Sequence, residues 1–286
     1  MPERVLVTGA LGYIGSHVVE ALVARGFEVI AVSRQAADER TSPTGVTRVV
    51  ADVVDPRLDV SSLADSPPDV LLHLAWQDGF VHGAPSHLEL LPRHLDFLRR
   101  AAAWGVGRIG SIGSMHEIGY WEGAVDSDTP TNPLSLYGVA KNALRQAMAI
   151  SLPASVETFW IRSFYVVGDD RRNHSVFTKL LEAVDRGDEE FPFTTGSSRY
   201  DFIDVTELAA QIALVATTRG LTGIVNCCSG EPISLRERVE SFIVEQGLGI
   251  RLRIGAFPDR PYDSPGIWGD ATLIRELVAA DRAQGG

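Results

Sequence analysis

The sequence lacks the long apolar run that a membrane-spanning helix needs, and no signal peptide precedes Val5. Lysine and arginine are dispersed along the chain, and the formal net charge is -11 at pH 7. This distribution excludes the clustered basic footprint of a nucleic-acid-binding protein. We therefore expect a cytoplasmic protein with no membrane and no nucleic acid among its partners.

Cysteine is scarce, and the histidines do not have the pattern of a metal site. The two cysteines, Cys227 and Cys228, are adjacent in a predicted buried strand, so they indicate neither a disulfide framework nor a metal cluster. His82, His87 and His94 do not share one helix face at metal-ligand spacing, and no acidic cluster accompanies them. We predict that no metal is bound.

Internal repeats and low-complexity linkers are also missing. Of the 286 residues, 45% are hydrophobic and 22% are charged, which is typical of a globular protein. A chain of this length buries a sizeable core as one large domain or as two closely joined domains.

The first thirty residues have the pattern of a strand, a glycine turn, a helix and a second strand. A run of β-branched residues comes first and a turn with three glycines follows it. Apolar residues at helical spacing come next, and a second run rich in β-branched residues follows shortly after them. This order predicts a βαβ unit with a parallel sheet and a right-handed crossover. The segments, in this order, are residues 4–7, 8–15, 16–25 and 28–32.

The glycines of this turn, Gly9, Gly12 and Gly15, have the spacing of a dinucleotide-binding loop. The first permits a tight turn, the second lets the backbone approach a pyrophosphate, and the third lets the helix pack on the strand. The phosphates would meet backbone N–H groups and the positive end of the helix dipole. The alternative is a glycine-rich turn that binds nothing, and the position between a strand and a helix favours the cofactor loop.

The end of the second strand carries Ser33 and Arg34, and no acidic residue follows before Asp38. An acid there would hydrogen-bond the ribose 2′-hydroxyl of NAD, whereas a basic residue accommodates the 2′-phosphate of NADP. A guanidinium suits that phosphate. We therefore expect NADP(H) rather than NAD(H), with an exposed loop arginine as the alternative for Arg34.

Further strands and a helix are predicted at 47–51, 69–75, 87–105 and 108–113. The second of these segments is nearly all apolar, as a strand buried on both faces should be, so His73 within it is predicted to be a packed core residue. The last strand ends at Ser114. That residue would lie at the carboxyl edge of the sheet, where doubly wound folds bind their ligands.

Tyr137 and Lys141 are four residues apart on a predicted helix, so they share one helix face. A phenol with a pKa near 10 is a poor proton shuttle at neutral pH, and a nearby ammonium is expected to lower that pKa. Ser114 would hold a substrate carbonyl against the phenol. The alternative is an ordinary surface Tyr and Lys on an amphipathic helix, and the glycine turn and Ser114 count against it.

Taken together, these motifs resemble the extended short-chain dehydrogenase/reductase superfamily, which includes nucleotide-sugar epimerases, dehydratases and ketoreductases. The resemblance implies an α/β fold, a Rossmann-type doubly wound parallel sheet with a smaller C-terminal substrate-binding domain. The dinucleotide-binding domain would comprise 1–168, with 199–219 returning to it, and the smaller domain 169–198 and 220–286. The matching segments, in the family's order, are 8–15, Asp52-Val53, 73–75, Ser114, Tyr137-x-x-x-Lys141, 162–168 and 200–205.

The resemblance also assigns roles to individual residues, with Ser114, Tyr137 and Lys141 as the catalytic set. The residues implied to bind the cofactor are Gly9, Leu11, Gly12, Tyr13, Ile14, Gly15, Ser33, Arg34, Asp52, Val53, Leu74, Ala75, Trp76, Tyr137, Lys141, Phe164 and Val167. The residues implied to bind the substrate are Ser114, Met115, Asn173, Arg199 and Arg260. Relatives usually have Arg-Asp where this chain has Tyr200-Asp201, so Arg199 is displaced by one position.

The reaction is expected to be a reduction. Dehydratases of the superfamily have an Asp-Glu pair after the catalytic hydroxyl residue, and this chain has Met115-His116 there, with Glu117 one residue too late. A 4-epimerase retains NAD, whereas Arg34 favours NADP. We therefore expect an NADPH-dependent reduction of the 4-keto group of a nucleotide-activated 6-deoxyhexose, with a dTDP-sugar as the favoured substrate. The alternatives are an NAD-retaining nucleotide-sugar 4-epimerase and a non-catalytic NADPH-binding regulator.

Relatives often pair through two helices of each subunit. By that resemblance a homodimer is expected, and the candidate helices are those predicted at 87–105 and 137–150.

Overall fold

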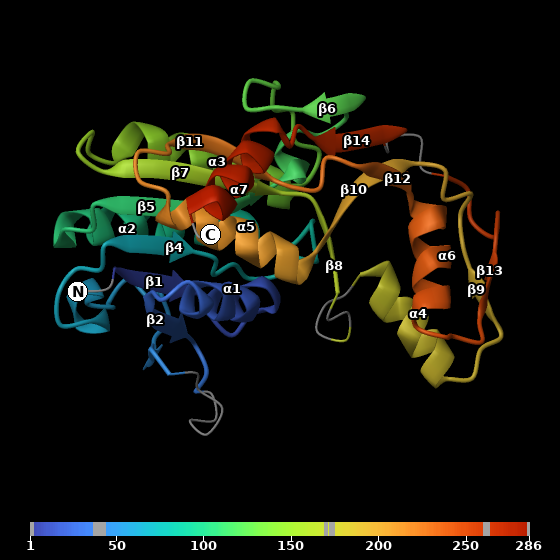
Figure 1. Ribbon diagram of the computed structural model, residues 1–286, viewed down its shortest axis with the longest axis horizontal. Coiled ribbons are helices and arrows are strands. Elements are labelled where there is room, and N and C mark those ends of the chain that lie inside the picture. Colours follow the sequence, from blue (N-terminus) through green and yellow to red (C-terminus); the bar gives the residue numbers. More distant parts are fainter. Residues whose placement is uncertain (1–2, 37–43, 169–170, 172–174, 260–263, 285–286) are drawn as a thin grey trace.

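A parallel seven-stranded sheet forms the centre of the protein, for which the computed structural model describes residues 3–36, 44–168, 171, 175–259 and 264–284 (Figure 1). Its strand order is β11-β7-β5-β4-β1-β2-β3, and all neighbouring strands run parallel. The order changes direction between β1 and β4, which is the topology of a doubly wound sheet. The predicted Rossmann-type fold is therefore confirmed. The strands are β1 Arg4–Thr8, β2 Glu28–Ser33, β3 Val46–Val50, β4 Val70–His73, β5 Arg108–Ser114, β7 Glu157–Ser163 and β11 Gly223–Cys227.

Helices cover both faces of this sheet. On one face α1 contacts α5 and α5 contacts α7, and on the other face α2 contacts α3. Side chains of β1 alternate between the two layers, because successive residues of a strand point to opposite faces. Val5 and Val7 pack with α1 and α5, whereas Leu6 packs with α2 and α3. The helices are α1 Tyr13–Ala24, α2 Ser86–Trp104, α3 Leu136–Ser151, α5 Val205–Thr217 and α7 Thr272–Gln284.

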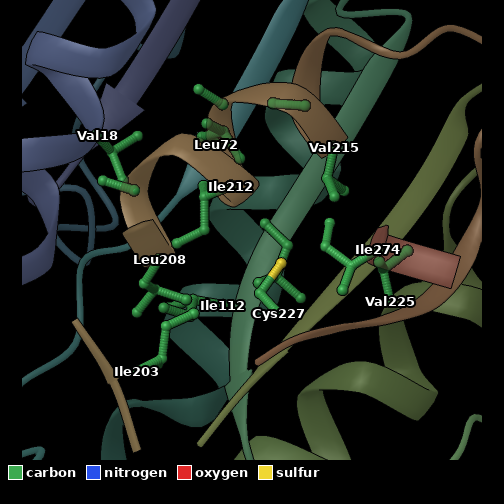
Figure 2. Close-up of a cluster of buried hydrophobic side chains, with 14 of the residues drawn as sticks. Val18, Leu72, Ile112, Ile203, Leu208, Ile212, Val215, Val225, Cys227 and Ile274 are labelled. Carbon is green, nitrogen blue, oxygen red and sulfur yellow. The ribbon is translucent and has the colours of Figure 1, made fainter. Parts of the chain in front are cut away.

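The core under α1, α5 and α7 consists of apolar side chains together with the thiols of Cys227 and Cys228. Figure 2 shows Leu208 and Ile212 of α5 in this core, together with Leu72 and Ile112 of the sheet. The two cysteines are buried and free, as expected for packed residues in place of a disulfide framework. Burial raises the pKa of both thiols, so they stay protonated.

The first helix begins three residues earlier than the sequence predicts, at Tyr13 rather than at Ser16. Gly12 is its N-cap, and Gly15 lies within its first turn. A Cβ on Gly15 would lie 2.1 Å from the carbonyl oxygen of Gly9, so only glycine lets the helix start this close to the turn. Apolar spacing could not indicate this start, because glycines at positions 9, 12 and 15 give residues 8–15 the pattern of a turn.

A smaller lobe lies beside the sheet, at the right of Figure 1, where α4 and α6 pack against each other and against β9 and β13. Its core contains Phe177 and Leu180 of α4 and Val239 and Phe242 of α6. A second sheet has the order β12-β10-β14-β6, with β8 beside β10. The remaining elements are η2 Val60–Leu63, η3 Met115–Glu117, β6 Gly123–Val125, β8 Tyr165–Val167, α4 Val176–Asp185, β9 Glu190–Pro192, β10 Arg199–Asp204, β12 Pro232–Ser234, α6 Leu235–Glu245, β13 Arg251–Arg253 and β14 Gly266–Gly269.

The division of the chain into two domains stays a prediction, but two of its segments lie elsewhere than expected. The sequence assigned 220–286 to the smaller domain, whereas β11 is an edge strand of the seven-stranded sheet and α7 packs on β11 and α5. The physical reason is hydrophobic: Val225 and Ile274 are buried in the core of the large sheet. Among the described elements of that segment, α6, β12, β13 and β14 lie outside the large sheet and its helices.

Candidate active site

The glycine turn between β1 and α1 is shaped for close approach of a ligand to backbone. Gly9 has a φ of +68°, and a Cβ there would lie 2.8 Å from the backbone nitrogen of Ala75. Gly12 caps α1 without a side chain of its own, so the positive end of the helix dipole faces the turn directly. This arrangement fits a pyrophosphate, which needs N–H groups and no intruding side chain.

A cavity of about 320 Å³ opens at this turn, along the carboxyl ends of β1, β2 and β4. The ends of these strands border the point where the strand order changes direction, which is where doubly wound folds bind nucleotides. Ten of the residues predicted to bind the cofactor line the cavity: Gly9, Leu11, Gly12, Ser33, Arg34, Asp52, Val53, Leu74, Ala75 and Trp76. Leu90 and His94 of α2 also line it, and the sequence analysis did not include them.

Seven other residues predicted to bind the cofactor do not line this cavity; two of them, Tyr137 and Lys141, belong to the catalytic set described below. Gly15 and Ile14 lie in the first turn of α1, and the hydroxyl of Tyr13 donates to the carbonyl oxygen of Gly168 at 2.5 Å. Phe164 packs in the core of the large sheet, and Val167 packs in the core of the smaller lobe. The side chains of Phe164 and Val167 are 6% and 4% exposed, and their contact with the cofactor stays a prediction.

Arg34 is exposed at the rim of the cavity. Its guanidinium donates to the side-chain oxygen of Gln77 at 3.3 Å, and the hydroxyl of Ser33 donates to the carbonyl oxygen of Gln35. Among the described residues that line the cavity, Asp52 alone carries a carboxylate, and it accepts from the backbone nitrogen of Val54. Arg34 therefore places a guanidinium at the rim of the cavity.

Ser114, Tyr137 and Lys141 come together at the carboxyl end of β5. Ser114 is the last residue of that strand, and its side chain lies close enough to the phenol of Tyr137 to lower the pKa of that phenol. The N-terminus of α3 approaches closely because Gly138 has no side chain: a Cβ there would lie 2.3 Å from the carbonyl oxygen of His116. Ser135 caps the same helix by accepting from the backbone nitrogen of Gly138.

Lys141 is a buried amine with 1% of its surface exposed. Its Nζ donates to the carbonyl oxygen of Ile112 at 2.9 Å and lies 3.8 Å from the ring centre of Trp76. The same atom is 5.8 Å from the ring centre of Tyr137. Lys141 is therefore buried and Tyr137 is half-buried beside it, so the pair is not an exposed Tyr and Lys on the surface of an amphipathic helix.

The electrostatics of this pair differ from the prediction. Burial raises the pKa of the Tyr137 phenol, the charge of Glu117 raises it further, and the hydrogen bond from Ser114 opposes both. Burial also lowers the pKa of Lys141 to about 7. The expected acidification of the phenol by the ammonium was wrong for this structure, because desolvation disfavours the charged forms of both groups. Tyr137 is consequently a protonated phenol at neutral pH.

Histidine rings surround Tyr137, which the sequence analysis missed. His82 stacks on the phenol ring at 5.2 Å between ring centres and 10° between planes. His116 meets His82 edge-on at 4.2 Å, and His87 lies 5.3 Å from Tyr137. Burial lowers the pKa of His116 to about 4, so its ring is neutral at neutral pH. His82 comes from the loop before α2 and His116 from η3, so no spacing along the sequence could have joined them.

A second buried pair connects the glycine turn to α2. His73 lies between the hydroxyl of Thr8, at 2.9 Å, and Nδ1 of His94, at 2.9 Å. His94 stacks on Trp76, which is the ring that faces Lys141. The expectation that His73 is a packed core residue is confirmed, since it is 1% exposed. The His73–His94 pair therefore packs behind Trp76, which lines the cavity.

The predicted substrate residues are less closely grouped. Ser114 belongs to the catalytic set, and Met115 is 7% exposed and packs in the main core. Arg199 is exposed and donates to the carbonyl oxygen of Pro232 at 2.7 Å. Asn173 and Arg260 lie outside the described residues.

Two other kinds of feature are missing from the part of the chain that the structure describes. It contains no group of three or more His, Cys, Asp or Glu side chains placed to hold a metal ion. Among the helices that the structure describes, none combines the length and the apolarity needed to cross a membrane.

Comparisons with known proteins agree on the family to which the chain belongs. The sequence profile of the NAD dependent epimerase/dehydratase family matches residues 5–228. The dTDP-6-deoxy-L-talose 4-dehydrogenase (NAD(+)) of Aggregatibacter actinomycetemcomitans is 42% identical over 272 residues, which cover 93% of this chain and 99% of that protein. The UDP-glucose 4-epimerase of Azospirillum brasilense is 26% identical, over 96% of this chain and 86% of that protein. The structure of the Thermus thermophilus UDP-glucose 4-epimerase in complex with NAD superposes with a TM-score of 0.78 at 23% identity, over 97% of this chain and 93% of that one.

Proposed function

Because the chain belongs to the NAD dependent epimerase/dehydratase family, we propose that it reduces the 4-keto group of a dTDP-activated 6-deoxyhexose. Membership makes it an NAD(P)-dependent oxidoreductase; the direction of the reaction and the sugar are the proposal. The observation that carries this assignment is the 42% identity to a dTDP-6-deoxy-L-talose 4-dehydrogenase over nearly the full length of both chains. A 4-dehydrogenase oxidises the 4-hydroxyl group of the sugar to a ketone. The reaction proposed here is the reverse, the reduction of that ketone to the alcohol.

The Ser114, Tyr137 and Lys141 geometry supports this chemistry. A reduced nicotinamide bound in the cavity supplies the hydride that the carbonyl carbon receives. The side chain of Ser114 lies beside the phenol of Tyr137, so both hydroxyls can face one carbonyl oxygen. As the C=O double bond is reduced, the O–H bond of Tyr137 breaks and the substrate oxygen takes the proton, giving an alcohol. The raised pKa of the Tyr137 phenol suits reduction of the ketone, because the phenol is protonated at neutral pH and can donate its proton.

Lys141 has a different task. Its buried ammonium is held by the Ile112 carbonyl and the face of Trp76, one helical turn from the phenol. In this position it stabilises the phenolate that Tyr137 becomes after proton transfer, before solvent returns the proton. Its N–H groups also lie beside the cavity wall formed by Trp76, where they can hold a ribose hydroxyl of the cofactor.

The cofactor is a nicotinamide dinucleotide, and we propose a preference for NADPH. Arg34 at the rim of the cavity supports it, since a guanidinium pairs well with a 2′-phosphate. The name of the 42%-identical relative specifies NAD(+), which favours the other choice. Assays with both cofactors therefore belong in the first experiment.

The experiment that tests the proposed function is a screen of ketosugar nucleotides with NADPH and with NADH, followed at the nicotinamide absorbance. We expect oxidation of the cofactor with a dTDP-4-keto-6-deoxyhexose and little with UDP-sugars. Binding of the cofactor without oxidation across the panel would contradict the proposal and support a non-catalytic regulator.

A nucleotide-sugar 4-epimerase is the second candidate, favoured by the 26% identity to the UDP-glucose 4-epimerase of Azospirillum brasilense. An epimerase oxidises and re-reduces the same carbon, so it retains its cofactor and needs none added. Purified protein that interconverts sugar nucleotides without added cofactor would support this candidate. The exposed rim around Arg34 supports an exchanging cofactor instead.

We also propose that the smaller lobe selects the substrate and that the active protein is a cytoplasmic homodimer. The lobe has its own apolar core, and the chain leaves the large sheet toward it just beyond Ser163, the residue of β7 that lies beside Ser114. For the dimer, α2 and α3 pack together and carry exposed apolar residues, including Leu88, Val139 and Ile150.

A further inference from the structure

Glu117 is a buried acid immediately behind the catalytic set. Its side chain is 0% exposed, and two N–H donors reach it: the backbone of Ser114 at 2.8 Å and the indole of Trp160, at 2.9 Å from Oε1 and 3.1 Å from Oε2. Two guanidiniums, those of Arg162 and Arg145, each place Nε 3.8 Å from Oε2. Isolated carboxylates are almost never buried this completely, because the loss of hydration is costly unless cations and donors replace the water.

The backbone around Glu117 is arranged to admit it. A Cβ on Gly113 would lie 2.0 Å from the indole nitrogen of Trp160 and 2.2 Å from Oε1 of Glu117, so β5 requires glycine at the point where the carboxylate lies. Ser114 and Glu117 also form a reciprocal capping box at the start of η3. Glu117, whose carboxylate is buried, therefore fixes the backbone of Ser114, the residue proposed to hold the substrate carbonyl.

The charge of Glu117 reaches both other members of the catalytic set. It raises the pKa of the Tyr137 phenol and raises that of Lys141, against the effect of burial on the latter. Burial raises the pKa of Glu117 itself, and Arg162, the Ser114 N–H, Trp160 and Arg145 oppose that shift. These are the groups that face the carboxylate from β5, β7 and α3.

We propose that Glu117 is a positioning residue of this active site: its buried carboxylate fixes the backbone of Ser114, and its negative charge favours the ammonium form of Lys141 beside Tyr137. The inference rests on the proposed ketoreductase function for its kinetic consequences, but not for its electrostatic ones. The Glu117 side chain is 0% exposed, so a ligand that enters the site from solvent does not reach it. Glu117 acts through Ser114, Tyr137 and Lys141.

The chain offers a direct test, because its sequence contains two lysines, Lys141 and Lys179. Lysine labelled with ¹³C at Cε gives one NMR signal for each, and the exposed Lys179 is an internal reference. In Glu117→Gln, which keeps the shape and loses the charge, the Lys141 signal should titrate about one pH unit lower than in the wild type. The Lys179 signal should not move. An unchanged Lys141 titration in the folded variant would overturn the proposal, and this readout needs no substrate.

Kinetics on the ketosugar provide the second readout. The alkaline limb of the kcat profile should move to lower pH by a similar amount in Glu117→Gln, since both Lys141 and Tyr137 lose the raising effect of the same charge. KM for the cofactor should be unchanged. A fall in kcat that is equal at every pH would mean that Glu117 is only a packing residue, and would contradict the proposal.

Glu157→Gln is the matched control. Glu157 pairs with Arg108 at 2.5 Å at the opposite end of the same sheet, so the substitution removes a carboxylate–guanidinium pair far from the site. It should leave both the Lys141 titration and the pH profile unchanged.

Glu117→Asp separates the two tasks and covers the case in which Glu117→Gln does not fold. It retains the charge but is one methylene shorter, so the contact with the Ser114 N–H is lost. We expect kcat to fall about tenfold, as for loss of one positioning hydrogen bond, with the Lys141 titration close to that of the wild type. Wild-type kcat in Glu117→Asp would contradict the positioning role. If the wild-type protein reduces no ketosugar, the proposed function is contradicted. The titration of Lys141 then still tests the electrostatic role of Glu117.

Discussion

At the scale of single residues, burial decides the chemistry of this site more than sequence spacing does. Tyr137 and Lys141 are one helical turn apart, and that spacing alone predicts a phenol acidified by an ammonium. Lys141 is instead buried and Tyr137 is half-buried, so desolvation raises the pKa of the phenol and lowers that of the amine to about 7. The sequence identified the pair, but the sign of its electrostatics depends on Glu117, Trp76 and the depth of the pocket, which only the fold reveals.

Arg34 carries the prediction on cofactor choice. Replacing it with Ala removes the guanidinium from the rim of the cavity, so the dissociation constant for NADPH should rise about tenfold or more, as expected for loss of a charge-assisted phosphate contact. The constant for NADH should change little. Titration of the protein with each cofactor, followed by fluorescence, measures both. An equal loss for the two cofactors would show that Arg34 does not read the 2′-phosphate.

At the scale of elements, the strands and helices of the dinucleotide-binding part were predictable because their patterns are local. Continuous apolar runs identified β1, β2 and β4, and the glycine turn placed α1 within three residues. β11 and α7 were assigned to the wrong part of the molecule, since nothing in a short buried strand states which sheet it joins. The contacts between His82, His116 and Tyr137 join a loop, η3 and α3, and no local pattern contains them.

The His73–His94 pair between β4 and α2 makes stability depend on pH. Burial lowers the pKa of His94 to about 3 and that of His73 well below its ordinary value near 6.5. Between these values the unfolded chain binds more protons than the folded one, so the free energy of unfolding falls as the pH drops below about 6.5. In His94→Gln this slope should be smaller, by up to about 1.4 kcal/mol per pH unit for one histidine.

Urea unfolding at a series of pH values between 4 and 8 (about the range in which histidines titrate) measures that slope. Leu98→Ala is the control, because it removes buried apolar volume from the same helix without removing a titratable group. It should lower the free energy of unfolding by about 2–5 kcal/mol with the wild-type slope. A wild-type slope in His94→Gln would mean that the pair does not cause the acid sensitivity.

At the scale of the whole molecule, we propose that two copies of the chain associate through α2 and α3. Val139 and Ile150 are 39% and 84% exposed on α3 and are eleven residues, or three turns, apart, so they lie on one face of that helix. Ile150→Glu places a charge on this face and should weaken a dimer formed through α2 and α3, raising the dissociation constant at least about tenfold.

Sedimentation velocity at several protein concentrations measures this association. Val244→Glu is the matched control, because Val244 is 80% exposed on α6 in the smaller lobe, away from α2 and α3. It should leave the association unchanged. A wild-type protein that is monomeric at all concentrations, or a dimer that Ile150→Glu leaves intact, would contradict an interface on these helices.

Tyr137, in the function proposed for this protein, delivers the proton in an NAD(P)-dependent reduction of a 4-keto sugar nucleotide. The most direct measurement compares NADPH and NADH oxidation by the wild type and by Tyr137→Phe with a dTDP-4-keto-6-deoxyhexose, alongside cofactor binding. We predict steady oxidation by the wild type, a loss of at least about a hundredfold in kcat for Tyr137→Phe, and nearly unchanged cofactor binding. Equal turnover by the two proteins would contradict this role of the phenol.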